Sequence, residues 1–350
     1  MNKDKINTAF RKYVKDHLSP TFTERSFVSS VYEALCNILE ANHCLQIGSY
    51  PRFTANRPLH DLDVLYVNGP WPGVVPNPAG LLSSLKNRIE KEFKNPTEFV
   101  VRVSVQTHSI TIAFFDGNEE VFAIDVVPAY RLGQTNEFGD DTYMVPEVIN
   151  RRRTKRQEFY QELARSNRTM GWIRSDPRGY IEVARQVNLA NNDFRKSAKF
   201  VKAWKCACKK LDDMFKLKSF HMEQIITAYF QKNLRLDIYD AVLQFFRDLP
   251  KLIERAQIPD RADESKNIDQ YVEDLTDAEK RLIINARNAV LSKLEDFTED
   301  TDVKDLIEAG FTSQPKSSAS PAIITRRSPA GATGFTPRSP WASDHAVTRR

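Results

Sequence analysis

One stretch, residues 46–67, constrains the fold of this chain more than any other. A short apolar segment ends in Gly48-Ser49, a turn-rich connector follows, and a second apolar segment begins with Asp61 and Asp63. Side chains at positions i and i+2 of a strand point to the same side, so a strand that starts here directs both carboxylates toward one point. The strand is anchored in a core by its apolar residues, Leu62, Val64 and Leu65.

A third acid, Asp125, lies in a run of β-branched and aromatic residues at 121–130, which predicts a buried strand. Asp61 and Asp63 repel each other unless a cation lies between them, and a buried carboxylate needs a partner. Magnesium binds carboxylate oxygens and substrate phosphates together. The three acids therefore predict a catalytic site with two Mg²⁺ ions, or Mn²⁺ in their place, for a nucleoside triphosphate. The simpler interpretation is a pair of solvated acids and a separate ion pair at a strand end.

Gly-Ser, then Asp-x-Asp on the next strand and a lone Asp on a later strand, is the pattern of the DNA polymerase β-like nucleotidyltransferases. Residues 48–63 (GSYPRFTANRPLHDLD) and 124–129 (IDVVPA) resemble more closely the bacterial cGAS/DncV-like nucleotidyltransferases, or CD-NTases. The resemblance covers about residues 22–300. It implies an enzyme that joins ribonucleoside triphosphates, ATP among them, into a cyclic di- or trinucleotide second messenger, with release of pyrophosphate, in anti-phage (CBASS-type) defence.

The same resemblance implies an α+β fold: a polymerase β-like palm with a mixed sheet backed by helices, and a helical C-terminal lobe across a central cleft. We expect a catalytic palm with an N-terminal spine helix at residues 1–171, a helical lobe at 172–312 and a disordered basic Ser/Pro-rich tail at 313–350. In the palm, Thr21-x-x-Glu24 predicts a helix N-terminus with a capping box. A helix is expected at about 80–93, with strands at 98–105 and 108–115.

A second group of candidate residues lies in the predicted helical lobe. A helical pattern from Asn192 places Lys199 and Lys202 on a different face from its core residues, which are Phe194, Val201, Trp204, Cys208 and Leu211. Ser219 is expected as the N-cap of the next helix, where free backbone amides favour an anion. The resemblance implies that Lys202 and Ser219 bind the β- and γ-phosphates, with Lys199 as a weaker candidate, and that Gly48 and Ser49 bind the phosphates from the palm.

Composition bounds the partners. The sequence contains no run of 18 apolar residues, which a membrane span would need, and its N-terminus lacks the apolar core of a signal peptide. We therefore expect a cytoplasmic protein without a membrane partner. The net charge of +5 equals that of residues 313–350, where six Lys and Arg face one Asp. The rest is neutral, so a nucleic-acid activator is not indicated, although the basic run 150–156 leaves it open. The resemblance implies a separate effector protein, activated by the product, and regulatory partner proteins.

Three other functions fit the same residues. An RNA-tailing or CCA-adding terminal nucleotidyltransferase would need an RNA-binding surface, which a neutral folded part does not favour. A degenerate binding module usually begins with loss of a carboxylate, whereas Asp61, Asp63 and Asp125 are all present. Nucleotide transfer to a protein or a small molecule is the third. Base preference, linkage, ring size, the activating signal and the oligomeric state are not encoded in these patterns.

Overall fold

The computed structural model describes residues 3–148, 171–298 and 301–308. The expected basic run at 150–156 and the expected tail at 313–350 lie outside these residues. In the first range the helices are α1 (Lys3–Tyr13), the π-helix η1 (Val14–Leu18), α2 (Phe22–Leu39), the 3-10 helix η2 (Ala41–His43) and α3 (Pro78–Glu92). The strands of that range are β1 (Cys44–Ile47), β2 (Asp61–Pro70), β3 (Val100–Val105), β4 (Ile110–Asp116), β5 (Glu119–Thr135) and β6 (Asp141–Pro146).

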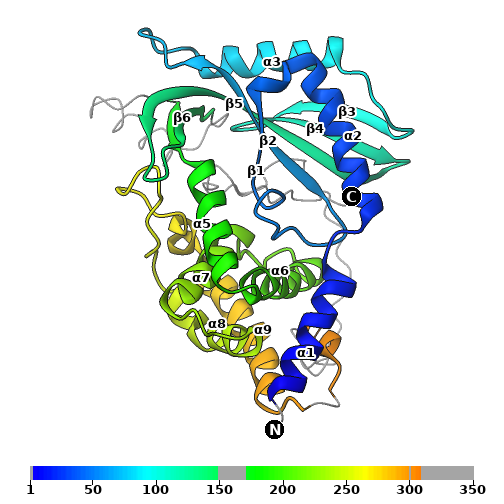
Figure 1. Ribbon diagram of the computed structural model, residues 1–350, viewed down its shortest axis with the longest axis vertical. Coiled ribbons are helices and arrows are strands. Elements are labelled where there is room, and N and C mark those ends of the chain that lie inside the picture. Colours follow the sequence, from blue (N-terminus) through cyan, green and yellow to red (C-terminus); the bar gives the residue numbers. More distant parts are fainter. Residues whose placement is uncertain (1–2, 149–170, 299–300, 309–350) are drawn as a thin grey trace, which may run out of the picture.

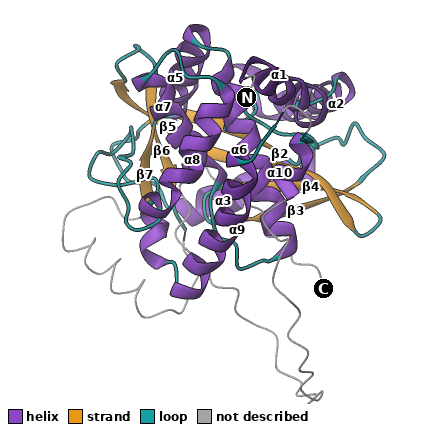
Figure 2. Ribbon diagram, turned by 90° about the horizontal axis from the view of Figure 1, so that it is seen from below, coloured by secondary structure: helices purple, strands orange, loops and turns teal. Residues whose placement is uncertain are grey.

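The remaining elements are one further strand of the sheet and a group of helices, most of which form a lobe below the sheet in Figure 1. They are β7 (Trp172–Ser175), α5 (Pro177–Ala190), α6 (Asp193–Leu211), α7 (Ser219–Lys232), α8 (Ile238–Leu252), η3 (Gln270–Asp274), α9 (Asp277–Glu295) and α10 (Val303–Glu308). Seen from below, in Figure 2, these helices lie in front of the strands. No helix in the described ranges is long and apolar enough to cross a membrane.

In the part of the chain that the structure describes, the sheet has seven strands, with the order β1-β2-β5-β4-β3 and with β6 and β7 continuing from β5. β2 and β5 run parallel to each other, and the other pairs are antiparallel. The α+β fold with a mixed sheet backed by helices is therefore confirmed. The parallel pair matters most for the site, because it joins the two strands that carry the predicted acids.

Strand alternation gives the two faces of the sheet different surroundings. Leu62 and Val64 of β2 and Ile124 of β5 pack in one core with residues of α2 and α3. The intervening residues point to the opposite face, where Leu65 and Val127 belong to a second, smaller apolar cluster. Asp61 and Asp63 therefore start the face of β2 that turns away from α2 and α3.

The predicted capping box at the start of α2 is confirmed. Thr21 Oγ1 accepts a hydrogen bond from the Glu24 amide, and the Glu24 carboxylate accepts one from the Thr21 amide. The expected helix near 80–93 is α3, which begins slightly earlier because Asn77 caps its N-terminus. The two expected strands are β3 and β4, each about two residues shorter at its start than predicted.

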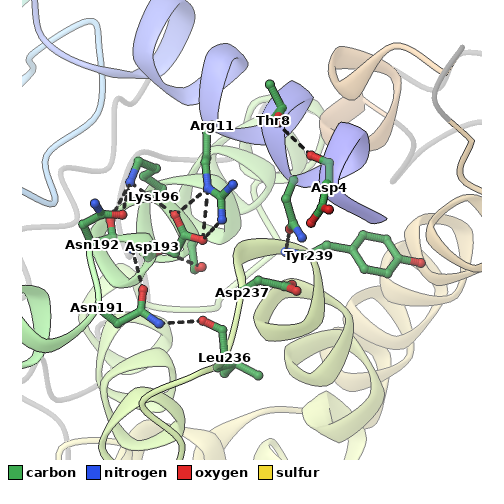
Figure 3. Close-up of polar contacts among 12 residues, drawn as sticks. Asp4, Thr8, Arg11, Asn191, Asn192, Asp193, Lys196, Leu236, Asp237 and Tyr239 are labelled. Atoms are coloured by element: carbon green, nitrogen blue, oxygen red, sulfur yellow. Dashed lines mark hydrogen bonds and ion pairs between the residues drawn. The ribbon is translucent and has the colours of Figure 1, made fainter. Parts of the chain in front are cut away.

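The N-terminal helix α1 packs with the helical lobe. Ile6 and Phe10 are fully buried in the large core that also contains Trp204 of α6. Figure 3 shows Arg11 of α1 reaching Asp193 at the start of α6, with a shortest nitrogen–oxygen distance of 2.6 Å. The expected division placed this helix with the palm at residues 1–171, whereas its apolar contacts are with the other lobe; the domain boundaries themselves stay a prediction.

Candidate active site

Two of the predicted acids, one on β2 and one on β5, lie in one row across the sheet. Asp63 is the register partner of Asp125 on the parallel strand and of Ile47 on β1. Asp125 is in turn the partner of Thr111 on β4. Residues in register project to the same side of a sheet, and Asp61 shares that side with Asp63 because it lies two residues away. The three predicted acids thus share one face of two adjacent strands.

Asp125 is held in a buried polar setting. Its side chain is almost fully buried, and Oδ1 accepts a hydrogen bond of 2.5 Å from the Thr111 hydroxyl. That hydroxyl in turn accepts a hydrogen bond of 2.6 Å from the Gln106 amide. Thr111 and Gln106 therefore fix the orientation of Asp125.

Gly48 at the end of β1 lies directly against Asp63. Its φ is +74°, in the left-handed region, and a Cβ atom at this position would lie 1.9 Å from Asp63 Oδ2. Only glycine fits both the backbone conformation and the close approach. Ser49 begins the following turn, in which its carbonyl accepts a hydrogen bond of 3.0 Å from the Thr54 amide. The Gly-Ser signature is therefore packed onto the acid row.

Three carboxylates on one face suit magnesium, which prefers hard oxygen ligands. Two of them, Asp63 and Asp125, are direct neighbours in register. Within residues 3–148, 171–298 and 301–308, no three His, Cys, Asp or Glu side chains stand close enough together to hold a metal ion as they are placed. The donor chemistry and the register fit a divalent ion, and the number of ions stays a prediction.

Lys202 of α6 reaches the connector between β1 and β2. Its ammonium donates a hydrogen bond of 2.8 Å to the Thr54 carbonyl and lies 3.4 Å from Oε2 of Glu223 on α7. The Thr54 amide donates a hydrogen bond to the Ser49 carbonyl. Thr54 therefore connects Lys202 to the Gly48-Ser49 turn through two direct hydrogen bonds. The structure thus brings Lys202 and Ser49, which are far apart in the sequence, into one network.

Glu223 is the centre of that network. Arg52 donates to its Oε1 at 2.5 Å, and the Thr54 hydroxyl donates to its Oε2 at 2.7 Å. Burial alone would raise the pKa of Glu223, but the charges of Arg52 and Lys202, with these hydrogen bonds, lower it to about 2. Glu223 is therefore a buried carboxylate in its charged form.

Lys199, one turn before Lys202, is also buried. Its ammonium donates a hydrogen bond of 3.0 Å to Ser19 Oγ. Burial, together with the neighbouring charges of Lys202, Arg195 and Arg25, lowers the pKa of Lys199 to about 8. This cationic face of α6 was expected; its burial was not. At the other end of the helix Leu211, expected in the core, is 63% exposed.

The expectation that Ser219 is an N-cap is wrong. Lys218 has the extended N-cap conformation, and Ser219 is the first residue of α7. The Ser219 hydroxyl accepts a hydrogen bond of 3.3 Å from Lys205, a buried residue of α6. Ser219 therefore lies beside a lysine of the same helix that carries Lys199 and Lys202, and its phosphate-binding role stays a prediction.

Comparison with known proteins gives matches in structure only. No protein-family model matches the chain, and no curated protein matches its sequence. E. coli MS115-1 CdnC with ATP superposes with a TM-score of 0.62 at 18% identity, over 88% of this chain and 99% of that one. CdnG from Bradyrhizobium diazoefficiens, a CD-NTase in complex with GTP, gives 0.57 at 12% identity, over 87% and 96%. E. coli DncV in its 3'-deoxy GTP bound form gives 0.51 at 16% identity, over 77% and 69%.

The chain has the CD-NTase fold. The resemblance found in the sequence is thus confirmed at the level of the fold. Within the CD-NTase fold of this chain, Asp61, Asp63 and Asp125 share one sheet face, and Gly48 packs against Asp63.

Sequence reasoning missed the network around Glu223. Arg52 and Thr54 were inside the stretch that carried the resemblance, but without a role. Glu223 lies four residues after Ser219, so it comes one helical turn later on α7. A carboxylate among the apolar residues of a helix was the available signal, and its partners could only be found in three dimensions.

Proposed function

We propose that this protein is a metal-dependent nucleotidyltransferase that joins ribonucleoside triphosphates and releases pyrophosphate. The observation that supports this most is the register of Asp63 with Asp125, with Asp61 on the same face and Gly48 against the Asp63 carboxylate. Carboxylates gathered on one face beside a glycine turn suit a reaction that needs charge neutralisation and positioning more than covalent chemistry by side chains.

Asp61, Asp63 and Asp125 would hold the divalent ions, Mg²⁺ or Mn²⁺. When bound, such ions neutralise phosphate charge and lower the pKa of an acceptor hydroxyl. The Thr111 hydroxyl would orient the Asp125 carboxylate through its hydrogen bond to Oδ1. We assign the triphosphate to the Gly48-Ser49 turn beside these carboxylates, where the backbone can approach phosphate oxygens because position 48 has no side chain.

The phosphate tail would be bound by cations of α6. Lys202 reaches the Ser49 turn through Thr54, and Lys199 adds a second buried ammonium. Lysine suits this role as a mobile point charge. Ser219, at the start of α7, would contribute its hydroxyl beside Lys205. Both lobes thereby take part in holding one nucleotide.

For the product we propose a cyclic di- or trinucleotide that acts as a second messenger in anti-phage (CBASS-type) defence, with ATP among the substrates. This rests on the sequence resemblance and on the shared fold with CdnC, which has been observed with ATP and in a complex with HORMA-deltaN. By the same comparison we propose a regulatory partner protein and a separate effector protein that the product activates.

The test is product identification. The full-length protein is incubated with all four ribonucleoside triphosphates and Mg²⁺ or Mn²⁺, and the products are treated with phosphatase and identified by mass. Phosphatase-resistant cyclic species are expected, and none with Asp61→Asn. Linear products that appear only on added RNA would instead support the tailing activity, and a nucleotide adduct on protein would support transfer to a protein acceptor.

A further inference from the structure

We propose that Glu223 is a positioning residue, which holds Lys202 in place to bind the phosphate tail of the nucleotide. This inference rests on the proposed function and assigns a role to a residue that touches no reacting atom. The role is mechanical. Glu223 of α7 accepts hydrogen bonds from Arg52 and Thr54 of the palm connector and pairs with Lys202 of α6. Lys202 in turn reaches the Ser49 turn through the Thr54 carbonyl.

The contacts of Glu223 divide between its two oxygens. Oε1 accepts the 2.5 Å hydrogen bond from Arg52, while Oε2 accepts the 2.7 Å hydrogen bond from Thr54 and faces the Lys202 ammonium at 3.4 Å. Lys202 also donates to the Thr54 carbonyl at 2.8 Å. Thr54 thus holds both ends of the Lys202–Glu223 pair, with its carbonyl on the lysine and its hydroxyl on the carboxylate.

The distances indicate that Lys202 is not needed to neutralise Glu223. Arg52 already pairs with the carboxylate at 2.5 Å, and both side chains are nearly fully buried. Lys202 lies farther from it, and Lys199 and Arg195 add positive charge to the same face of α6. A buried group with more cations than anions attracts an anion. Phosphate is the anion that the proposed function supplies.

An ammonium group has three hydrogen-bond donors in fixed directions. Two of those on Lys202 are directed by the Thr54 carbonyl and Glu223 Oε2, so the direction of the third is set. Preorganisation of this kind avoids the cost of ordering a long side chain when the ligand binds. Without Glu223 the lysine head group would keep the Thr54 carbonyl as its one acceptor among the described residues, and it would lie among like charges.

The test compares a nucleoside triphosphate with its monophosphate. Calorimetry would use full-length protein, Mg²⁺, AMP and an ATP analogue that resists transfer at the α-phosphate. We expect Glu223→Gln to weaken binding of the triphosphate analogue about tenfold, or about 1.4 kcal/mol, while AMP binding stays unchanged. The matched control is Asp193→Asn, which removes another buried, arginine-paired carboxylate at the start of α6, the helix that carries Lys202 (Figure 3). This control should not alter the ratio of triphosphate affinity to AMP affinity.

Two further variants keep the inference testable if Glu223→Gln does not fold. Thr54→Val removes the hydroxyl donor to Glu223 Oε2 without changing any charge, and we expect a loss of about threefold in the same ratio. In a Lys202→Met background, Glu223→Gln or Thr54→Val should cause no further loss, because both act through the lysine.

The outcomes separate the two proposals. If the wild-type protein binds the triphosphate no better than the monophosphate, the proposed function fails. If the wild type discriminates but Glu223→Gln binds the triphosphate equally or more tightly, the function stands and the positioning role is wrong, since Glu223 would then act only as a repelling charge. Equal losses for the triphosphate and AMP would also overturn it, because they would indicate a general structural role.

Discussion

Asp63 of β2 and Asp125 of β5 are register partners on two parallel strands. Sixty-one residues of chain separate them, including α3, β3 and β4. The pairing brings them side by side on the face that turns away from α2 and α3. The sheet thus gathers negative charge on one face, while α6 presents buried cations, of which Lys202 bonds the connector at Thr54. This relationship leads to four predictions.

Replacement of Asp125 by Asn should abolish activity while the fold survives. Asn keeps an oxygen that can accept the Thr111 hydrogen bond but removes the charge needed to hold a divalent ion. We expect a loss of roughly three orders of magnitude or more in turnover, in the range found for groups that stabilise transition-state charge. Initial rates and thermal unfolding of the two proteins measure this, and normal turnover in the variant would remove Asp125 from the site.

Gly48→Ala should disturb the acid row, and Gly117→Ala is its matched control. Both glycines have a left-handed backbone, with φ of +74° and +58°, but a Cβ at Gly117 meets no atom within 4 Å, whereas at Gly48 it collides with the Asp63 carboxylate. We expect Gly117→Ala to lower the free energy of unfolding by roughly 1 kcal/mol with activity intact. Gly48→Ala should cost about 1–3 kcal/mol more and abolish activity. Denaturant unfolding and rate measurements compare them; equal behaviour of the two variants would show that Gly48 has no special contact with Asp63.

The charge on Glu223 should make stability depend on acid pH. Its folded pKa of about 2 lies below its ordinary value of 4.5, so its contribution is fully present above pH 4.5 and is lost as the pH falls toward 2. The size of this contribution is roughly 3 kcal/mol. Unfolding measured between pH 7 and pH 2 should show a shallower loss of stability in Glu223→Gln than in the wild type. Parallel curves would mean that Glu223 is not ionised as described.

Lys199 should link nucleotide binding to alkaline pH. Its folded pKa is lowered to about 8 by burial and by Lys202, Arg195 and Arg25, so it is charged below pH 8 and loses its charge as the pH rises. Affinity for the triphosphate analogue should therefore fall between pH 7 and pH 9. The free energy of unfolding should be lower below pH 8 than at pH 10, because the charged lysine is buried. In Lys199→Arg the affinity should stay constant, because arginine does not deprotonate in this range. The same pH dependence in both proteins would exclude Lys199 as its source.

Local patterns predicted the elements of the site better than its connections. Strand alternation and spacing placed Asp61 and Asp63 at the start of one buried strand and Asp125 inside another. These signals could be read from the sequence because they depend only on neighbouring residues. The register that joins Asp63 to Asp125 depends on the whole sheet. Ser219 was expected as an N-cap because serine favours that position, but the extended residue before the helix is Lys218.

The burial of Lys202 was beyond sequence reasoning for a related reason. A lysine on a polar helix face is usually solvated, and only the return of the connector against α6 and α7 places Thr54 and Glu223 beside it. The N-terminal helix illustrates the same limit, because Ile6 and Phe10 mark an apolar face without indicating which lobe covers it.

The central claim is that the acid row carries out nucleotidyl transfer with pyrophosphate as the leaving group. The most direct measurement follows α-³²P-labelled ATP with the other ribonucleoside triphosphates and Mg²⁺, and quantifies pyrophosphate beside labelled product for the wild type and for Asp63→Asn. One pyrophosphate for each phosphodiester bond in the wild type, and none in the folded variant, is the predicted result. Pyrophosphate release that is undiminished in Asp63→Asn, or release of inorganic phosphate without a labelled product, would contradict it.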